Sequence, residues 1–400
     1  MWEITDRGFL PTADPIKTLV SNKEYHYGQA GCDPYITRLE HIPSHIPQWI
    51  EGRKLREELV HAIKEVTPYM VGRNFDYVLD RTPNEEYLER LMHLFTYMAS
   101  SYVYARYENP ATRIPSEIAI PLVKIAEKLD RKPILSYASY CLTNWERMDL
   151  NEPIKLDNIS LLSNFCAREV GKADEDWFIL VHVDIEQAAA DGVSACKQLL
   201  ENPWRDEVAN IVTANDMLTK IFVSLAKMNK TLKKMPEQCS PDNYFRWVRP
   251  YIFSFNNVVY EGCFDNKPQT FRGETGAQSS IIPAFLSALG VKHQDSMLTH
   301  HLAEMRDYMP APHRRFLQNL EGLAANNQEI SLRSLSQRDP VLRDIYNECV
   351  NEIISFRNLH FEFAVNYIQK KVENPAGTGG TPYVPWLKQL REETEAHLLP

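Results

Sequence analysis

A single apolar stripe near the C-terminus constrains the fold of this chain more than any other feature. Over residues 340–373, apolar side chains recur every three or four positions, which is the spacing of one face of an α-helix. At the helical rotation of about 100° per residue, the side chains that fall close to one line are Leu342, Tyr346, Cys349, Ile353, Phe356, His360, Ala364 and Tyr367. So long a helix must pack against others to bury this face. The stripe therefore predicts a helical domain.

The same periodicity recurs along most of the chain. We expect helices over residues 53–66, 84–107, 116–129, 177–200, 206–234, 241–253, 279–289, 296–309 and 340–373. Alternating strand patterns are rare, and glycine accounts for only 15 of the 400 residues, which disfavours turn-rich all-β folds. The first 50 residues are rich in proline and are predicted to form an irregular arm. The predicted fold class is all-α.

Charge and targeting signals limit the possible partners. The chain carries 44 Lys and Arg against 53 Asp and Glu, a net charge of −9, whereas proteins that bind nucleic acid or anionic membranes need a basic surface. The N-terminus has no basic start followed by an apolar segment, so no signal peptide is predicted. The seven cysteines form no CxxC pair and are expected to be reduced thiols. We therefore expect a cytoplasmic protein that binds neither nucleic acid nor membranes.

His360 lies in the middle of the long stripe, and two roles are compatible with that position. A buried histidine can be a core residue whose ring is satisfied by a neighbour. It can also be an axial ligand to haem iron, because apolar neighbours exclude water while Nε2 is offered to the metal. Arg357, one turn earlier, could then reach a haem propionate with its guanidinium. Periodicity does not choose between these roles.

Two other clusters have the residue types of metal sites without the expected context. His182 and Asp184 form an HxD pair, which in non-haem iron enzymes contributes to a facial triad, usually on a β jelly roll. His300, His301 and Glu304 include an i, i+4 pair of possible ligands, but no further ligand is indicated. An exposed polar helix face explains this second cluster more simply.

Eight groups of motifs occur in a fixed order between about residues 115 and 390. They are IAIP (118–121) with PILSY (133–137) and NW (144–145); IEQAAA (185–190); YFRWVR (244–249); VYEG (259–262); GETGAQSS (273–280); MRDYMP (305–310) with HR (313–314); SFRNLH (355–360); and GTGGT (377–381). No single motif is specific. The set in this order resembles the indoleamine/tryptophan 2,3-dioxygenase family, specifically its indoleamine branch.

The resemblance implies an all-α, two-lobed fold that holds haem b. Residues 1–160 would form the smaller N-terminal lobe, which covers the distal pocket. Residues 161–400 would form the large helical haem-binding catalytic domain. The boundary falls in the polar, irregular stretch 150–176, which is consistent with a connection between two helical lobes.

The resemblance also assigns residues to the haem. His360 matches the axial ligand to the iron, and Arg357 matches an arginine that contacts a propionate. Thr275 and Gly276 fall in the loop beside the distal haem face. Leu286 stands where the family often has an aspartate, so on the resemblance alone Arg357 lacks an acidic partner.

Further residues match positions that bind the substrate. Arg249 matches the arginine that binds the substrate carboxylate, a role that suits its bidentate guanidinium. Thr378 matches the threonine of a GTGG loop that closes over the amino acid. The positions that line the indole pocket are Tyr137, Phe178 and Tyr244, the last in place of the usual phenylalanine.

His182 departs from the indoleamine branch and is the candidate catalytic residue. That branch commonly has serine here, whereas the tryptophan-specific branch places a histidine in the equivalent distal site. The imidazole could hydrogen-bond the indole N–H or the bound oxygen. The alternative is a core histidine that shares a helix face with Phe178, Ala189 and Val193.

The resemblance implies a haem-dependent dioxygenase with O₂ as co-substrate. It would convert L-tryptophan or a related indoleamine to N-formylkynurenine, in tryptophan catabolism by the kynurenine pathway. Two alternatives stay open at this point. One is an enzyme that transforms a modified tryptophan, similar to the pyrrolnitrin-pathway protein that rearranges a halogenated tryptophan. The other is a haem-binding protein without catalytic activity.

Overall fold

Helices dominate the computed structural model, which describes residues 1–19, 33–70, 75, 79, 84–106, 108–167, 169–202, 207–326, 331–371 and 383–400. The α-helices are α1 (Asp33–Glu51), α2 (Leu55–Met70), α4 (Glu85–Tyr104), α5 (Ser116–Lys128), α6 (Glu169–Ala188), α7 (Ala190–Glu201), α8 (Glu207–Leu232), α9 (Met235–Gln238), α10 (Pro241–Asn243), α11 (Ile281–Leu289), α12 (Met297–Met305), α13 (Ala311–Asn326), α14 (Leu332–Arg338), α15 (Pro340–Tyr367) and α16 (Tyr383–Glu395). The predicted helical fold class is confirmed. Helices α13, α14 and α16 lie where the sequence analysis predicts none.

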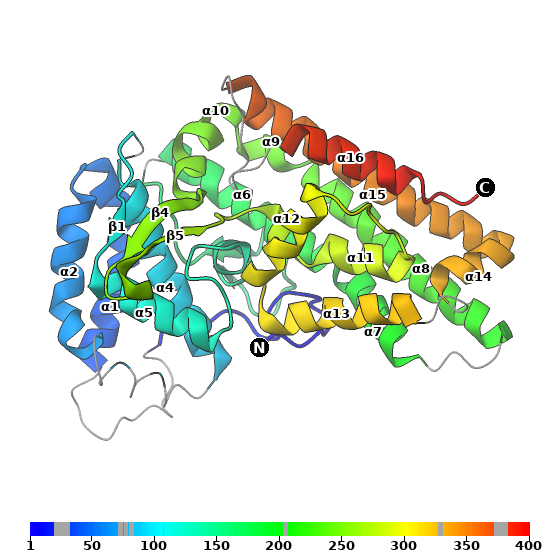
Figure 1. Ribbon diagram of the computed structural model, residues 1–400, viewed down its shortest axis with the longest axis horizontal. Helices are drawn as coiled ribbons and strands as arrows, with labels where there is room; N and C mark the ends of the chain where they lie inside the picture. Colours follow the sequence, from blue (N-terminus) through cyan, green and yellow to red (C-terminus); the bar gives the residue numbers. More distant parts are fainter. Residues whose placement is uncertain are drawn as a thin grey trace.

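Helix α15 is the predicted stripe helix. The Asp339 side chain begins it by accepting hydrogen bonds from the backbone N–H groups of Val341 and Leu342, and Pro340 occupies the first turn, where its missing N–H costs nothing. The helix ends at Tyr367, a few residues before the predicted end. Its apolar face packs against α8, and α16 covers a further side (Figure 1).

The prediction of an irregular arm over the first 50 residues is wrong for α1. Pro43 and Pro47 both lie inside this helix. Three of its aliphatic side chains are nevertheless fully or almost fully buried, namely Leu39, Ile42 and Ile46. Each such burial contributes about 1.5–3 kcal/mol, which is comparable to the cost of about 3 kcal/mol for a proline in a helix. Packing against α2 and α4 therefore outweighs the local propensity.

The predicted helix over 177–200 is two helices. Helix α6 begins earlier, at Glu169, and the chain turns at Ala189 before α7. Gly192 lies in the first turn of α7 against α11, where a Cβ atom would come within 2.8 Å of the Phe285 ring. The turn thus brings α7 against α8 and α11, a tertiary arrangement that helical periodicity does not encode.

The predicted helix over 241–253 is also divided. After the short α10, the chain forms a π-helix, η2 (Tyr244–Val248), and then a 3₁₀-helix, η3 (Arg249–Ile252). A second π-helix, η1 (Ala138–Leu142), lies in the first half of the chain. Such π-helical turns often mark functional sites.

The strands are few and short, as predicted. Strand β1 (Arg113–Ile114) pairs in parallel with β4 (Phe255–Tyr260), which pairs antiparallel with β5 (Pro268–Phe271). Strands β2 (Trp145–Arg147) and β3 (Ile159–Leu161) form a separate antiparallel pair. The three-stranded sheet therefore ties the start of α5 to the segment that follows η3.

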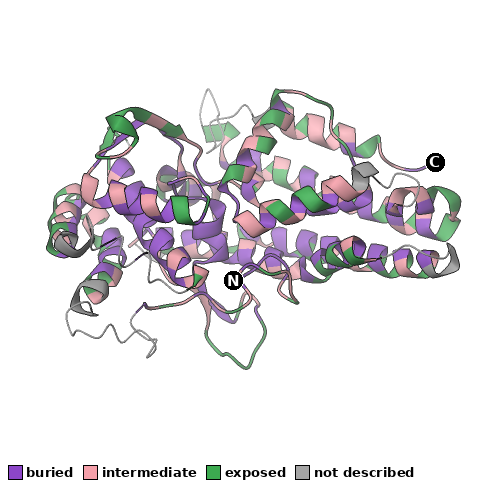
Figure 2. Ribbon diagram, turned by 60° about the horizontal axis from the view of Figure 1, so that its bottom comes forward, coloured by how far each residue is buried: buried purple, intermediate pink, exposed green. Residues whose placement is uncertain are grey.

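The buried residues form two hydrophobic clusters. Helices α1, α2, α4 and α5 supply much of the first, together with the three-stranded sheet, and α7, α8, α11 and α15 supply much of the second (Figures 1 and 2). Helix α6 contributes to both, with Ile179 in the first and Val181 in the second, and Phe178 packs against both. Tyr260 and Tyr308 belong to the first cluster, so the division of the chain at residue 160 stays a prediction.

Three negative findings apply to the described ranges. No helix there is long and apolar enough to cross a bilayer. No group of three or more His, Cys, Asp or Glu side chains there could hold a metal ion. The cysteines described there are all free thiols, and Cys32 lies outside these ranges. The second finding does not exclude haem, because haem iron needs only one ligand from the protein.

Candidate active site

His360 lies on the apolar face of α15, at a position that other parts of the protein do not fully cover. Leu342, Ile353, Ala364 and Tyr367 on the same stripe are buried, but the His360 side chain has accessible surface. Burial nevertheless lowers the pKa of His360 to about 4, because the surrounding protein displaces water. His360 thus keeps exposed surface although the protein packed around it excludes much of the water. No described residue forms a hydrogen bond with it, so no neighbour supports the role of a satisfied core histidine.

His182 on α6 is anchored by its own helix. Its Nδ1 lies 2.7 Å from the carbonyl oxygen of Phe178, one turn earlier. A carbonyl oxygen only accepts, so Nδ1 carries the proton and Nε2 of the neutral ring is an acceptor. Burial lowers the pKa of His182 below its usual value, although the Phe178 carbonyl opposes this shift. The ring is therefore neutral at pH 7, with Nε2 as an oriented acceptor.

The two histidines lie within electrostatic reach of each other. After burial, the next cause of the lowered pKa of His360 is the positive charge that His182 would carry when protonated. Helix α8 packs against both α6 and α15 and so fixes their relative position. The tertiary fold therefore brings the candidate axial ligand and the candidate distal residue to the same part of the interior.

An aromatic wall surrounds His182. The Phe178 ring lies 4.7 Å from His182, 5.0 Å from Tyr244 and 6.4 Å from Tyr140, as centroid distances. The Tyr137 ring meets His182 edge-on at 5.9 Å. All three residues predicted to line an indole pocket, from α6, η2 and the chain before η1, are thus brought together. Such a wall suits a flat aromatic ligand.

Arg249 stands at the junction of η2 and η3, next to this wall. It is buried, and its guanidinium lies over the Phe253 ring, 4.4 Å from the centroid, and over the Phe245 ring at 5.4 Å. Burial and the charge of Glu274 raise the pKa of Tyr244, and the charge of Arg249 opposes this rise. The Arg249 guanidinium therefore lies within electrostatic reach of the aromatic wall. Stacking on two rings holds the planar cation in a fixed orientation.

A buried carboxyl that the sequence analysis missed supports the wall. Glu186 Oε1 accepts hydrogen bonds from the Tyr137 hydroxyl at 2.9 Å and from the Ser279 hydroxyl at 2.8 Å. Burial raises the pKa of Glu186 to about 7, so its protonated and ionised forms are both populated near neutrality. Glu186 belongs to the IEQAAA motif, but nothing in that motif indicates that its side chain is buried.

Two more buried carboxyls lie close to the site. Glu175 accepts from the backbone N–H groups of Phe165 and Cys166 and from the Tyr140 hydroxyl at 3.3 Å, and burial raises its pKa to about 7. Burial raises the pKa of Glu274, in the GETGAQSS motif, to about 8. Acidic residues are usually exposed, so sequence gives little sign of such positions.

The GETGAQSS loop is tightly packed at one end and open at the other. A Cβ atom on Gly273 would come within 2.3 Å of the Ile252 carbonyl oxygen, so only glycine allows this close approach to η3. The Thr275 hydroxyl accepts from the Ala277 N–H at 3.4 Å, and nothing lies within 4 Å of a Cβ on Gly276. The predicted contact of Thr275 and Gly276 with a haem stays a prediction.

Arg357 joins α15 to α16 and to the loop after α11. Its guanidinium donates to the Leu390 carbonyl and the Thr394 hydroxyl, and to Nε2 of His293 at 3.1 Å. Nδ1 of His293 in turn donates to Glu393 at 2.7 Å. The charge of Glu393 opposes the lowering of the pKa of Arg357 by burial. Arg357 forms no ion pair with Glu393 among the described residues, but its hydrogen-bond network reaches Glu393 through His293, so the predicted lack of an acidic residue in this network is wrong.

The other residues named from the sequence are engaged elsewhere or not described. Asp184 of the HxD pair accepts from the Thr231 hydroxyl at 2.9 Å. Glu304 forms an ion pair with Arg272 at 2.9 Å. Both carboxylates thus have partners other than a metal. Thr378 lies outside the described residues.

The chain is similar over most of its length to several known proteins. The family model described as indoleamine 2,3-dioxygenase matches residues 1–397. Indoleamine 2,3-dioxygenase 1 of Rattus norvegicus is 30% identical over 384 residues, which cover 90% of this chain and 88% of the relative. Indoleamine 2,3-dioxygenase nanC of Aspergillus nanangensis is 27% identical, with 97% and 93% covered. A protein named myoglobin, from Haliotis madaka, is 26% identical, with 88% and 92% covered.

Proposed function

Because the chain belongs to the indoleamine 2,3-dioxygenase family, we propose that it is a haem-dependent enzyme that adds both atoms of O₂ across the indole C2–C3 bond of L-tryptophan. The product would be N-formylkynurenine, and the reaction would take place in the cytoplasm as a step of tryptophan catabolism. The proposal rests on the family, on the two histidines and on the aromatic wall beside Arg249.

The residues around His360 fit a haem. The ring is neutral at pH 7, since its pKa is about 4, and iron requires the neutral imidazole. Accessible surface, together with the lack of any hydrogen bond to a described residue, leaves Nε2 available. We assign His360 as the axial ligand and Arg357 to a propionate. When bound, haem supplies the iron at which O₂ is activated, and the protein supplies orientation and exclusion of water.

The wall around His182 supports a substrate pose. We place the indole against Phe178, Tyr244 and Tyr137, with its N–H donating to Nε2 of His182. Arg249 would bind the carboxylate, because its buried, stacked guanidinium offers two parallel N–H groups. His182 thereby holds the ring in one orientation and needs no proton transfer of its own.

The observation that carries the proposal is that two neutral histidines lie within electrostatic reach of each other, His182 anchored in the aromatic wall and His360 without a described hydrogen bond. The test is to load the protein with haem, reduce it, and supply L-tryptophan and O₂. We expect N-formylkynurenine, which mass spectrometry detects as tryptophan plus two oxygen atoms. Absence of turnover from haem-loaded, reduced protein with any indole substrate would contradict the enzymatic proposal.

A haem protein without catalytic activity is the second candidate. It is favoured by the relatives from Haliotis that are named myoglobin and that match 88–90% of this chain. The two candidates differ in one measurement. A non-catalytic protein would bind O₂ reversibly and leave L-tryptophan unchanged over many binding cycles, whereas the enzyme would consume both.

A further inference from the structure

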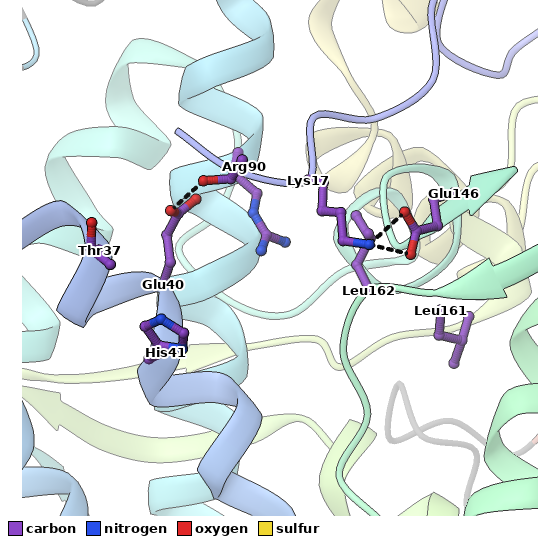
Figure 3. A pocket seen from close by; sticks show the side chains of 9 residues that line it. Lys17, Thr37, Glu40, His41, Arg90, Glu146, Leu161 and Leu162 are labelled. Atoms are coloured by element: carbon purple, nitrogen blue, oxygen red, sulfur yellow. Dashed lines mark hydrogen bonds and ion pairs between the residues drawn. The ribbon is translucent and has the colours of Figure 1, made fainter. Parts of the chain in front are cut away.

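A second cavity lies apart from the candidate active site, among α1, α4 and the chain that follows β3. Its volume is about 520 Å³, within the range of about 300–1,000 Å³ typical of small-molecule pockets. Figure 3 shows the side chains that line it. None of its lining residues belongs to the aromatic wall, to Arg249 or to the two histidines. A ligand here would therefore occupy a site separate from the candidate active site.

Arg90 on α4 is the unusual member of the lining. It is only 8% exposed, yet its Nε and Nη1 atoms are buried without a hydrogen-bond partner, and no described residue forms an ion pair with its guanidinium. Figure 3 shows the guanidinium extending between Glu40 and Lys17. A buried cation with unsatisfied donors is costly and rare in folded proteins. A ligand that accepts hydrogen bonds from Arg90 would remove this cost.

The other charged groups of the lining differ in how far they are neutralised. Lys17 contacts both carboxylate oxygens of Glu146, at 2.9 and 3.0 Å, so this pair neutralises itself. Among the described residues, Glu40 accepts from two neutral donors, the Thr18 hydroxyl at 2.7 Å and the Leu19 N–H at 2.5 Å, and from no cation. The charges of Glu40 and, to a smaller extent, Glu146 help to hold up the pKa of Arg90 against burial, but neither carboxylate forms an ion pair with Arg90 among the described residues. The cavity thus contains a cation and an anion that are separated from each other.

We propose that this cavity binds a zwitterionic α-amino acid with a small apolar side chain. The α-carboxylate would accept from Arg90, and the α-ammonium would donate to Glu40. Leu161 and Leu162, both half-buried in the lining, would contact the side chain. A phosphate dianion fits less well, because the carboxylates of Glu40 and Glu146 would repel its second charge.

The test uses L-leucine and two analogues that each lack one charged group. Isothermal titration of the full-length protein should show binding of L-leucine. The acid without the amino group, 4-methylpentanoate, and the amine without the carboxylate, 3-methylbutylamine, should each bind about tenfold more weakly or worse, since each loses one charge-assisted contact. If 4-methylpentanoate or inorganic phosphate binds as tightly as L-leucine, the zwitterion proposal is wrong. Absence of any L-leucine binding overturns it equally.

Variants locate the site. Arg90→Met keeps the aliphatic stem and removes the charge, and Glu40→Gln removes the opposing charge. Each should weaken L-leucine binding about tenfold or more. The Arg90→Met variant should melt at the same temperature as the parent protein or higher, because the substitution removes a buried charge with no described hydrogen-bond partner. If this variant folds and still binds L-leucine normally, the proposed site is wrong. Glu57→Gln on the exposed face of α2 and Arg249→Ala in the candidate active site are the controls and should leave L-leucine binding unchanged.

Discussion

The two histidines of the candidate active site differ in the contacts that fix their imidazole rings. His182 on α6 is fixed at Nδ1 by the Phe178 carbonyl and is packed between the rings of Phe178 and Tyr137. His360 on α15 has neither a described hydrogen bond nor a described ring contact. Burial lowers the pKa of both rings, so both are neutral at pH 7.

This difference indicates two different kinds of chemistry. An anchored ring presents one acceptor in one direction, which suits the orientation of a substrate that donates a hydrogen bond. A ring with both nitrogens available is a ligand for a group that supplies its own strong bond, such as a metal. The two positions should therefore respond to substitution in different measurements, which the following predictions use.

The largest effect is expected from His360→Ala. Removing the only proposed protein ligand to the iron should abolish the normal ferric and ferrous haem spectra. The fold should persist, because the ring has no described partner to lose. Absorption spectra after haem loading, with circular dichroism as the control for folding, test this. Unchanged spectra would remove His360 from the proposal.

Arg249→Ala should have the next largest effect, confined to the side of the site that holds the substrate. Truncating one partner of a buried, hydrogen-bonded charge pair costs about 2–5 kcal/mol of binding free energy. Titration of the haem-loaded protein with L-tryptophan should show that loss, with haem spectra retained. Tryptamine, which lacks the carboxylate, should bind the parent protein poorly and should be insensitive to the substitution. Equal affinity of the parent protein for both ligands would contradict the carboxylate role.

His182→Ser should have a smaller and more selective effect. Loss of one neutral hydrogen bond costs about 1 kcal/mol, so L-tryptophan binding should weaken about fivefold. Discrimination against 1-methyl-tryptophan, which has no indole N–H, should largely disappear. Haem occupancy should not change, in contrast to His360→Ala. A variant that loses thermal stability and keeps its preference for L-tryptophan would make His182 a core residue.

The pH dependence of L-tryptophan binding should separate the same roles. Burial places the pKa of His182 below the ordinary value of 6.5, so the neutral acceptor is present at pH 7 and is lost only as the pH falls further. Affinity should be flat from about pH 8 to 6.5 and should fall below that. His182→Ser should remove this acidic decline. A decline that persists in the variant would assign it to another group.

Glu274→Gln is expected to have the smallest effect on ligand binding, because this substitution should change the pH dependence of stability instead. The pKa of Glu274 is about 8 in the folded protein against an ordinary value of 4.5, so the folded state retains a proton that the unfolded state loses. Stability contributed by this group therefore falls as the pH rises from 4.5 through about 8. The melting temperature of the variant, relative to the parent, should increase between pH 6 and pH 9. Glu57→Gln on the exposed face of α2 is the control, and a constant difference between Glu274→Gln and the parent would contradict the raised pKa.

The errors in sequence interpretation share a cause. Proline in α1, the break between α6 and α7, and the conversion of 241–253 into η2 and η3 all run against local propensity or periodicity. In each case contacts with distant segments decide the local conformation. Glu393 was missed as a member of the Arg357 network for the same reason, because it lies on a helix near the end of the chain.

What the sequence determined by itself is what short-range spacing encodes. The existence of α15, its start at residue 340 and the position of His360 on its apolar face follow from a pattern of three and four residues, and the helical fold class follows from many such patterns. Only the tertiary structure decided that His360 lies within electrostatic reach of His182, that Arg249 stacks on Phe253, and that Arg90 is buried without a hydrogen-bond partner among the described residues. Desolvation and electrostatic reach depend on every element packed around a group, and no periodicity along one segment contains that information.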